Sequence, residues 1–416
     1  MMSESSERVS KSLSNRSNWA KNLSVLSVGA LALSVNFGVA LVSVSTLFVV
    51  LTFVFVLFCG QPQEGNNRNS IISSLTIKVI LLSLVWFGVT SLWSIADLRQ
   101  VGAEFIRYAR LLIIPLVFYL IRTPQHGHRI IQTWVVGHSL VIFTSYLLWL
   151  GIYVPWATSA WAIDFYTPFA SSLEQPIMSS LIVAVVWFFR NDLSKTLGKG
   201  PVFVVVAFTL ANVFFLMIGR SGMLSMILVL TMICGWTVRP RQRFLIVLLP
   251  FLLFGILYLS STRFEERVRA IPHEVSEYQQ GKIETSQALR LEFWRRSLQA
   301  IEARPLLGYG IGSWPNAYKL ALNGDPGVKA DSPHQQFLLW WVEGGLLGLI
   351  LLLSVYAAIY FDALRLETKA KQALITILGV LFFTSLMNCP LQGAGMSEFF
   401  SVIIATLMSF TARYKS

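Results

Sequence analysis

The chain has 416 residues, of which 55% are hydrophobic and only 13% are charged. Soluble globular chains carry about 25% charged residues, so this composition excludes an ordinary soluble enzyme and indicates a polytopic membrane protein. The net charge of +12 is large enough for a nucleic-acid-binding protein. No nucleic-acid partner is expected, however, because the positive residues are distributed as in a membrane protein.

The apolar runs predict an all-α fold with about twelve transmembrane helices, since one span needs about 20 apolar residues. The run over 23–59 is too long for one helix and becomes less apolar at Asn36, Phe37 and Gly38, which predicts two helices and a tight turn. The predicted spans are 22–38, 41–59, 71–94, 103–121, 130–151, 171–190, 201–218, 222–238, 244–260, 336–361, 373–389 and 396–412.

These spans divide the chain into five predicted segments. Residues 1–21 are polar and basic and lack the small-residue cleavage site of a signal peptide, which predicts a retained cytoplasmic tail. Residues 22–260 hold nine spans and 336–412 hold three. Between them lies one long polar segment, 261–335, and 413–416 form a second short tail.

The distribution of Lys and Arg predicts which side of the membrane each segment faces. Segments that alternate on one side, both termini included, carry 18 of these residues. The short segments on the other side carry only four, namely Arg99, Arg107, Arg110 and Arg220. Because positive residues concentrate in cytoplasmic loops, both termini are expected in the cytoplasm. The four arginines and the segment 261–335 are expected on the outer face.

The segment 261–335 is far longer than an ordinary loop and is predicted to contain structure. In "TSQALRLEFWRRSLQAIEAR" (285–304), Thr285 or Ser286 can cap a helix that Pro305 stops. The helix is predicted to be amphipathic, with its apolar face formed by Leu291, Trp294, Leu298 and Ile301.

Three glycines follow this helix in "PLLGYGIGSW" (305–314), at Gly308, Gly310 and Gly312. A phosphate-binding loop is one interpretation of such a cluster. No strand precedes the glycines, however, which favours a compact turn.

In "DSPHQQFLLWWVEGG" (331–345), a lone histidine stands at the start of a long apolar helix. Ser332 is an N-cap candidate, Pro333 suits the first helical position, and Gln335 completes a capping box, which would place His334 in the first turn. The positive end of the helix dipole disfavours imidazolium, so a neutral ring able to act as a general base is expected. The alternative is an interfacial histidine that bonds to a neighbouring helix.

Arginines gather at the same outer face. Arg220 lies in a three-residue turn between two spans, and Arg107 and Arg110 lie in the first turns of the fourth span. Glu104 is placed to neutralise Arg107. Snorkelling explains many such arginines, but cations at membrane depth also mark functional sites. Because guanidinium groups bind phosphate oxygens bidentately, these arginines predict a site for a phosphate-rich anion.

Glu343 is a second candidate for catalysis, but its position argues against that role. It lies nine residues past His334, about half a turn round the helix and roughly 13 Å along it, so it should face the opposite side. The GxxxG spacing of Gly344 and Gly348 is typical of close helix packing. Glu343 is therefore predicted to belong to the packing of the bundle.

Several familiar motifs are missing from the chain. It has no DxD-like acidic pair, Walker motif, HExxH or GxSxG. Cys59, Cys234 and Cys389 follow no metal spacing and are predicted to be packing residues without a disulfide framework. A reaction at the outer face is therefore expected to use neither a metal nor another cofactor.

Three features, taken in order, resemble the superfamily of O-antigen ligases and polymerases. They are the "GRSG" arginine between two spans, a long external loop with "ALR…W…PLLGYG", and the helix "PHQQFLLWWVEGGLLGL". The resemblance covers about 200–390 and is closest to lipopolysaccharide O-antigen ligases. The first five spans are similar in hydropathy only, and Gln335 stands where many relatives have Asn.

This resemblance implies a GT-C-like glycosyltransferase of the bacterial inner membrane. Such an enzyme transfers O-antigen polysaccharide from undecaprenyl pyrophosphate to lipid A-core in the periplasm, without a metal. It implies His334 as the catalytic base and Arg220 and Arg290 as pyrophosphate-binding residues, with Arg107 and Arg110 as further candidates. From its own surroundings in the sequence, Arg290 would be assigned to the solvated face of its helix.

Three alternatives remain open at this point. An O-antigen polymerase would be expected to have two sizeable external loops, whereas the second candidate loop, 152–170, is short and aromatic. A protein O-oligosaccharyltransferase would share the site and use a Ser or Thr hydroxyl as acceptor. A polysaccharide or lipid flippase would place polar residues along a path through the membrane, whereas here they cluster at one face.

Overall fold

The computed structural model of the chain describes residues 19–58, 73–121, 123–157, 159–281, 285–324, 327–328 and 330–411. Most of the predicted N-terminal tail, the tail 413–416 and Cys59 lie outside these residues. Within the described part the backbone is helical, and its only β-pairing is an isolated antiparallel bridge between Leu366 and Thr411. The predicted all-α fold class is confirmed.

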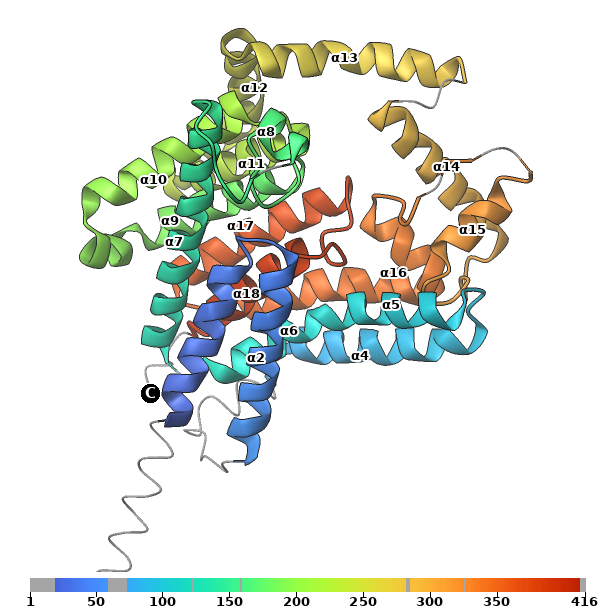
Figure 1. Ribbon diagram of the computed structural model, residues 1–416, viewed down its shortest axis with the longest axis horizontal. Coiled ribbons are helices and arrows are strands. Elements are labelled where there is room, and N and C mark those ends of the chain that lie inside the picture. The colour runs from blue at the N-terminus through green and yellow to red at the C-terminus, as the bar shows by residue number, and fades with distance from the viewer. Residues whose placement is uncertain are drawn as a thin grey trace, which may run out of the picture.

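Figure 1 shows the arrangement of the helices. A first helix covers residues 19–34. The labelled helices are α2 (Val39–Phe58), α4 (Leu75–Thr90), α5 (Leu98–Ala109), α6 (Ile113–Leu120), α7 (Pro124–Trp149), α8 (Ala160–Phe165), α9 (Glu174–Leu197), α10 (Lys199–Ala211), α11 (Arg220–Thr237), α12 (Leu249–Ser260), α13 (Thr262–Gln279), α14 (Ser286–Ala303), α15 (Trp314–Ala321), α16 (Gln336–Ala363), α17 (Thr368–Ser385) and α18 (Met396–Met408).

Eight helices in the described ranges are long and apolar enough to cross a membrane. They are Val39–Phe58, Leu75–Trp93, Pro124–Trp149, Glu174–Leu197, Lys199–Leu216, Arg220–Thr237, Arg241–Ser260 and Gln336–Ala363. The other predicted spans also contain helix, but it is shorter or more polar, as in the 13-residue α18. A polytopic membrane protein is supported, and the count of twelve spans stays a prediction.

The predicted span 103–121 is wrong as a single helix. α5 begins earlier, at Leu98, because the Asp97 side chain accepts a hydrogen bond from the backbone N–H of Gln100 at 2.7 Å and forms a capping box with it. The chain then tightens into a 3-10 turn at Arg110–Leu112 before α6 begins. Arg107 therefore lies near the end of an amphipathic helix and not in the first turn of a span.

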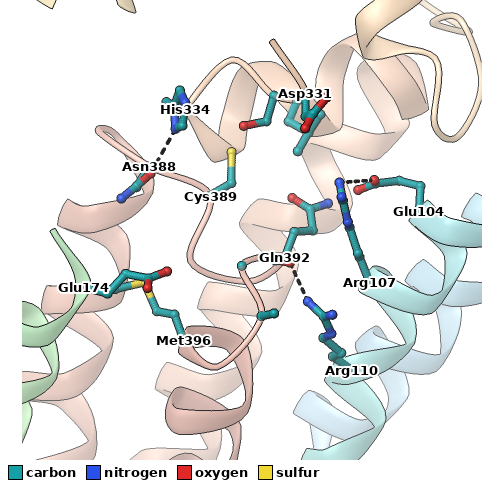
Figure 2. A pocket seen from close by; sticks show the side chains of 14 residues that line it. Glu104, Arg107, Arg110, Glu174, Asp331, His334, Asn388, Cys389, Gln392 and Met396 are labelled. Atoms are coloured by element: carbon teal, nitrogen blue, oxygen red, sulfur yellow. Dashed lines mark hydrogen bonds and ion pairs between the residues drawn. The ribbon is translucent and has the colours of Figure 1, made fainter. Parts of the chain in front are cut away.

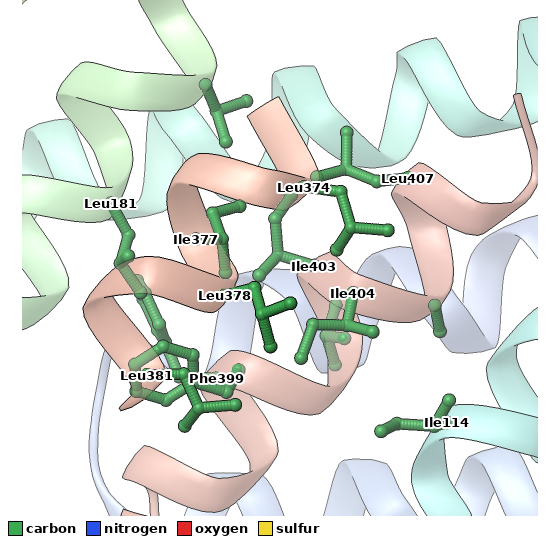
Figure 3. Packing of buried hydrophobic residues seen from close by; sticks show 14 of the residues in the cluster. Ile114, Leu181, Leu374, Ile377, Leu378, Leu381, Phe399, Ile403, Ile404 and Leu407 are labelled. Carbon is green, nitrogen blue, oxygen red and sulfur yellow. The ribbon is translucent and has the colours of Figure 1, made fainter. Parts of the chain in front are cut away.

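The core lies where α9, α17 and α18 meet, with α6 alongside. Figure 3 shows Leu181 of α9 against Leu381 of α17 and Phe399 of α18, which are all buried. Fully burying one such large apolar side chain stabilises a protein by about 1.5–3 kcal/mol in water. Inside a bilayer, dispersion contacts between well-fitted side chains take over that role.

The segment 261–335, which was predicted to lie on the outer face and to contain amphipathic helices, folds into three helices, of which only α14 had been located in the sequence. α13 spans the gap between α12 and α14 at the top of Figure 1, and α14 and α15 pack above α16. α14 starts as predicted, since the Thr285 side chain accepts a hydrogen bond from the N–H of Ala288.

The predicted apolar face of α14 is wrong in part. Leu298 is exposed, whereas Phe293 and even Arg296 are buried. The neutralising partner of Arg296 is Glu292, one turn earlier, whose Oε1 lies 2.7 Å from the arginine Nε. This pair lets a charged side chain occupy the buried face, which spacing of apolar residues alone does not reveal.

The glycine cluster forms a compact turn that enters a break in α16. Gly345 has φ +64° and interrupts the helix, which frees carbonyl groups of the preceding turn. The N–H of Tyr309 donates to the carbonyl of Val342 at 2.8 Å, and the N–H of Gly310 donates to that of Glu343 at 3.0 Å. At Gly308 a Cβ would lie 2.6 Å from the backbone N of Gly345. The predicted compact turn is confirmed, and its approach to α16 leaves no room for a side chain at Gly308.

Candidate functional site

His334 lies in the loop before α16 and not in its first turn, so the predicted capping box of Ser332 is wrong. The helix begins at Gln336, and Gln335 is its N-cap, with the side-chain oxygen accepting a hydrogen bond from the N–H of Leu338 at 2.7 Å. His334 itself has φ +50°. A left-handed residue other than glycine costs on the order of 1–3 kcal/mol and often marks a functional site.

The two glutamines after the histidine have separate structural roles. Gln335 caps the helix, as described above. Gln336 is fully buried and connects α16 to the loop between α17 and α18: its Nε2 donates to Oε1 of Gln392 at 2.8 Å, and its Oε1 accepts from the N–H of Leu391 at 3.2 Å. The "HQQ" sequence thus fixes the start of the helix and the loop that faces His334.

α14 holds the other side of the histidine. The Trp294 indole N–H donates to the carbonyl of Pro333 at 3.1 Å, and the Phe293 ring lies 6.2 Å from the His334 ring, measured between centroids. Arg290 precedes these aromatic residues by one helical turn, so the three share one side of α14. A single helix therefore positions both the histidine loop and an arginine.

Asn388, in the loop after α17, is the hydrogen-bond partner of the histidine ring. Its Oδ1 lies 3.3 Å from Nδ1 of His334, as Figure 2 shows. An amide oxygen only accepts, so this contact favours the tautomer that carries its proton on Nδ1, which leaves the Nε2 lone pair for a base. Burial and, secondarily, the charge of Arg290 lower the pKa of His334, against the raising effect of Asn388. The predicted neutral ring follows from burial, not from the helix dipole.

Arg220 and Arg290 lie close together at the start of α11 and on α14. Arg220 makes two hydrogen bonds to the carboxylate of Glu274 in α13. Its Nη1 donates to Oε2 at 3.1 Å, and its Nη2 donates to Oε1 at 2.8 Å. No ion pair found among the described side chains involves Arg290. Burial, followed by the nearby charge of Arg220, lowers the pKa of Arg290. Two cations therefore share one carboxylate, which leaves positive charge for an anion.

Arg107 and Arg110 lie in a different setting, in a cavity of about 340 Å³ that His334 also lines. Arg107 is 2.9 Å from Glu104, as predicted, and Arg110 is 3.1 Å from Glu398 and donates to the carbonyl of Gln392 at 2.8 Å. Figure 2 shows Glu104, Arg107, Arg110 and Gln392 around the cavity. Its remaining carboxyl groups are those of Glu174 and Asp331. Acidic groups thus outnumber the arginines here.

Glu343 faces away from the cavity into the protein, in line with its predicted role in packing. It accepts a hydrogen bond from the hydroxyl of Tyr108 at 3.0 Å and lies 3.5 Å from the backbone N of Trp314. It thereby connects α16 to α5 and α15. Across the described residues, no group of three or more His, Cys, Asp or Glu side chains is placed to hold a metal ion.

Two polar residues of the site were missed in the sequence. Glu274 lies in a polar helix that resembles any solvated segment, and its pairing with Arg220 spans 54 residues. Asn388 was included in a predicted span, although an amide near the end of an apolar helix is itself a signal of a polar site.

Comparison with known proteins gives two matches. A family model described as O-antigen ligase matches residues 203–353, a range that includes Arg220, Arg290 and His334. An uncharacterised protein of Haemophilus influenzae is 25% identical over 218 residues, which cover 50% of this chain and 53% of that protein. The chain thus spans about half the length of this relative. The match over 203–353 supports the assignment of the chain to the O-antigen ligase superfamily.

Proposed function

We propose that the protein is a glycosyltransferase of the bacterial inner membrane that transfers O-antigen polysaccharide from undecaprenyl pyrophosphate to lipid A-core on the periplasmic side. One observation carries the proposal: within the segment that matches O-antigen ligases, a buried histidine with a lowered pKa lies next to Arg290, which has no ion pair among the described side chains. This combination supplies a base for the acceptor and positive charge for the leaving group.

The chemistry uses both groups in one step. Nε2 of His334 takes the proton of an acceptor hydroxyl, and the oxygen attacks the anomeric carbon of the glycan. The bond from that carbon to the lipid pyrophosphate breaks, and its electron pair stays on the pyrophosphate. Arg220 and Arg290 stabilise the resulting negative charge, which is the role that preorganised cations have in many transferases.

Donor binding requires that the pyrophosphate compete with Glu274. The carboxylate of Glu274 occupies both terminal nitrogens of Arg220, the groups that a phosphate would bind bidentately. The Arg220 and Glu274 side chains are 21% and 15% exposed, so the pair lies near solvent and can exchange one anion for another. In the donor complex, α13 would then lose its contact with Arg220.

The cavity of Arg107 and Arg110 suits the acceptor better than the donor. Its arginines are already paired with carboxyl groups, which leaves no surplus of positive charge for a pyrophosphate, whereas carboxyl groups, amides and arginines together accept from and donate to sugar hydroxyls. His334 lines this cavity, so a sugar held there would present its hydroxyl to Nε2. We therefore assign Arg107 and Arg110 to the acceptor side.

Reconstitution tests this function. Purified protein is incubated with glycan linked to undecaprenyl pyrophosphate and with lipid A-core, and glycosylated lipid A-core is expected, at an unchanged rate in excess EDTA. Loss of activity in EDTA that Mg²⁺ restores would refute the metal-independent step.

The alternative functions give different products in this assay. Longer glycan on the carrier would identify a polymerase, and glycan on an added Ser- or Thr-containing protein would identify an oligosaccharyltransferase. Movement of the donor across a vesicle membrane without a new bond would identify a flippase. Each of these products, in place of glycosylated lipid A-core, overturns the ligase assignment.

A further inference from the structure

A second hollow lies far from His334, between α9 and α10. Its volume is about 460 Å³. The helices are joined at Gly198, and each contributes one face to this groove. The apolar residues on the α10 side are Val202, Phe203 and Val206, at i, i+1 and i+4. Phe203 is 73% exposed, so the groove is open to the surroundings of the helix pair.

One end of this α9–α10 groove is basic. Arg190, Lys195 and Lys199 all line it. The Arg190 guanidinium lies over the Trp187 ring, 4.7 Å from its centroid. Lys195 is 3.4 Å from Asp192, but Asp192 also binds Lys369 of α17 at 2.5 Å. That one carboxylate is therefore shared with a cation outside the groove, and the groove keeps a positive charge.

The groove belongs to the face opposite the proposed transfer site. α9 begins at Glu174, which lines the His334 cavity, and its last turn carries Lys195. At 1.5 Å per residue these ends are about 30 Å apart, the thickness of a bilayer core. The distribution of Lys and Arg predicts that the basic end faces the cytoplasm.

We propose that the α9–α10 groove binds one anionic phospholipid of the cytoplasmic leaflet. Its phosphate lies among Arg190, Lys195 and Lys199, and an acyl chain lies along Phe203 and Val206. Basic pockets between helices on the cytoplasmic side recognise anionic headgroups in this way. The lipid would connect α9 to α10.

Native mass spectrometry of the full chain in detergent tests this, with phosphatidylglycerol and zwitterionic phosphatidylethanolamine as probes. The wild type should retain phosphatidylglycerol preferentially. Each cation is expected to contribute roughly fivefold to the affinity, so the variant with Arg190→Gln, Lys195→Gln and Lys199→Gln should lose about 100-fold. Equal retention of the two lipids by the wild type would overturn the proposal.

Two further variants distinguish lipid binding in the groove from a general effect of positive charge on lipid binding. Arg239→Gln, Arg241→Gln and Arg243→Gln remove the same charge from a neighbouring predicted cytoplasmic segment and should leave binding unchanged; an equal loss would overturn the proposal. Val206→Trp keeps every cation but fills the groove, and should reduce phosphatidylglycerol retention at least tenfold. If this variant is folded and binds like the wild type, no lipid chain occupies the groove.

Discussion

The two arginine pairs near His334 differ in how their charge is balanced. Arg107 and Arg110 are each paired with a carboxylate, Glu104 and Glu398, in a cavity that holds further acidic groups. Arg220 and Arg290, in contrast, share Glu274 alone among the described side chains. The number of arginines at a face therefore does not reveal an anion site. An anion site is indicated instead by a surplus of cations over carboxylates, and this surplus is found at Arg220 of α11 and Arg290 of α14.

His334 lies between these two regions, and its removal should have the largest effect. His334→Ala should lower the rate of transfer by about 100-fold or more, as expected for a lost general base, with donor binding intact. Because φ is +50° at this position, His334→Asn is the better variant, since Asn tolerates the left-handed conformation. Single-turnover transfer and donor binding are measured on each purified variant.

The control for this variant is His273→Ala, which removes an exposed histidine from α13 in the same outer segment and should leave transfer unchanged. If His334→Asn transfers glycan at the wild-type rate, the histidine is only a loop residue, and both proposed subsites lose their reacting group.

The arginine pairs themselves should separate donor from acceptor. Arg220→Ala and Arg290→Ala should each lose roughly 10- to 100-fold in donor affinity, the usual effect of losing hydrogen bonds to a charged group. Lys should rescue poorly, because a point charge does not bind two oxygens as a guanidinium does. Arg107→Ala should leave donor affinity unchanged and raise KM for lipid A-core.

Donor affinity is measured with the lipid pyrophosphate alone, without acceptor, so that the two effects are separated. A loss of donor affinity in Arg107→Ala as large as in Arg290→Ala would show that both pairs bind pyrophosphate, and the distinction between them would be wrong.

Removing the competing carboxylate should have a smaller and opposite effect. Glu274→Gln keeps the shape of the side chain but not its charge, so Arg220 should bind the donor several-fold more tightly. The matched variant is Glu104→Gln, which changes a carboxylate on the other side and should leave donor affinity unaltered. Weaker donor binding in Glu274→Gln would mean that this carboxylate orients Arg220 and does not compete for it.

The smallest expected effect is a shift of the pH profile. Burial and then Arg290 lower the pKa of His334 below 6.5, so the neutral, active ring persists as the pH falls and is lost only below that value. The acid limb of kcat/KM for the acceptor, which reports the free enzyme, should have its midpoint below 6.5. A midpoint above 6.5 would place another group, or a more exposed histidine, in the role of the base.

Local features of the site were predictable to the extent that they depend on neighbouring residues. Thr285 and Pro305 bound α14 correctly, and the spacing of Glu104 and Arg107 predicted their ion pair. The N-cap of α16 was assigned three residues too early, to Ser332 and not to Gln335. The sequence fits a capping box of Ser332 with Gln335 as well as it fits Gln335 as the cap itself. Local propensity cannot choose between such alternatives when the loop is held by another helix.

The sequence by itself determined the helical membrane class. The outward placement of 261–335 and the roles of the site residues are its predictions. Apolar run length, periodicity and charge depend only on residues close in the chain, and they are therefore readable without a structure. Only the tertiary structure decided that Glu274 binds Arg220 and that Asn388 orients His334, each across 54 residues. It also decided that Arg107 and Arg110 are already neutralised. The balance of charge at a site depends on which distant carboxylates the packing brings near, because electrostatic interactions act through space and not along the chain.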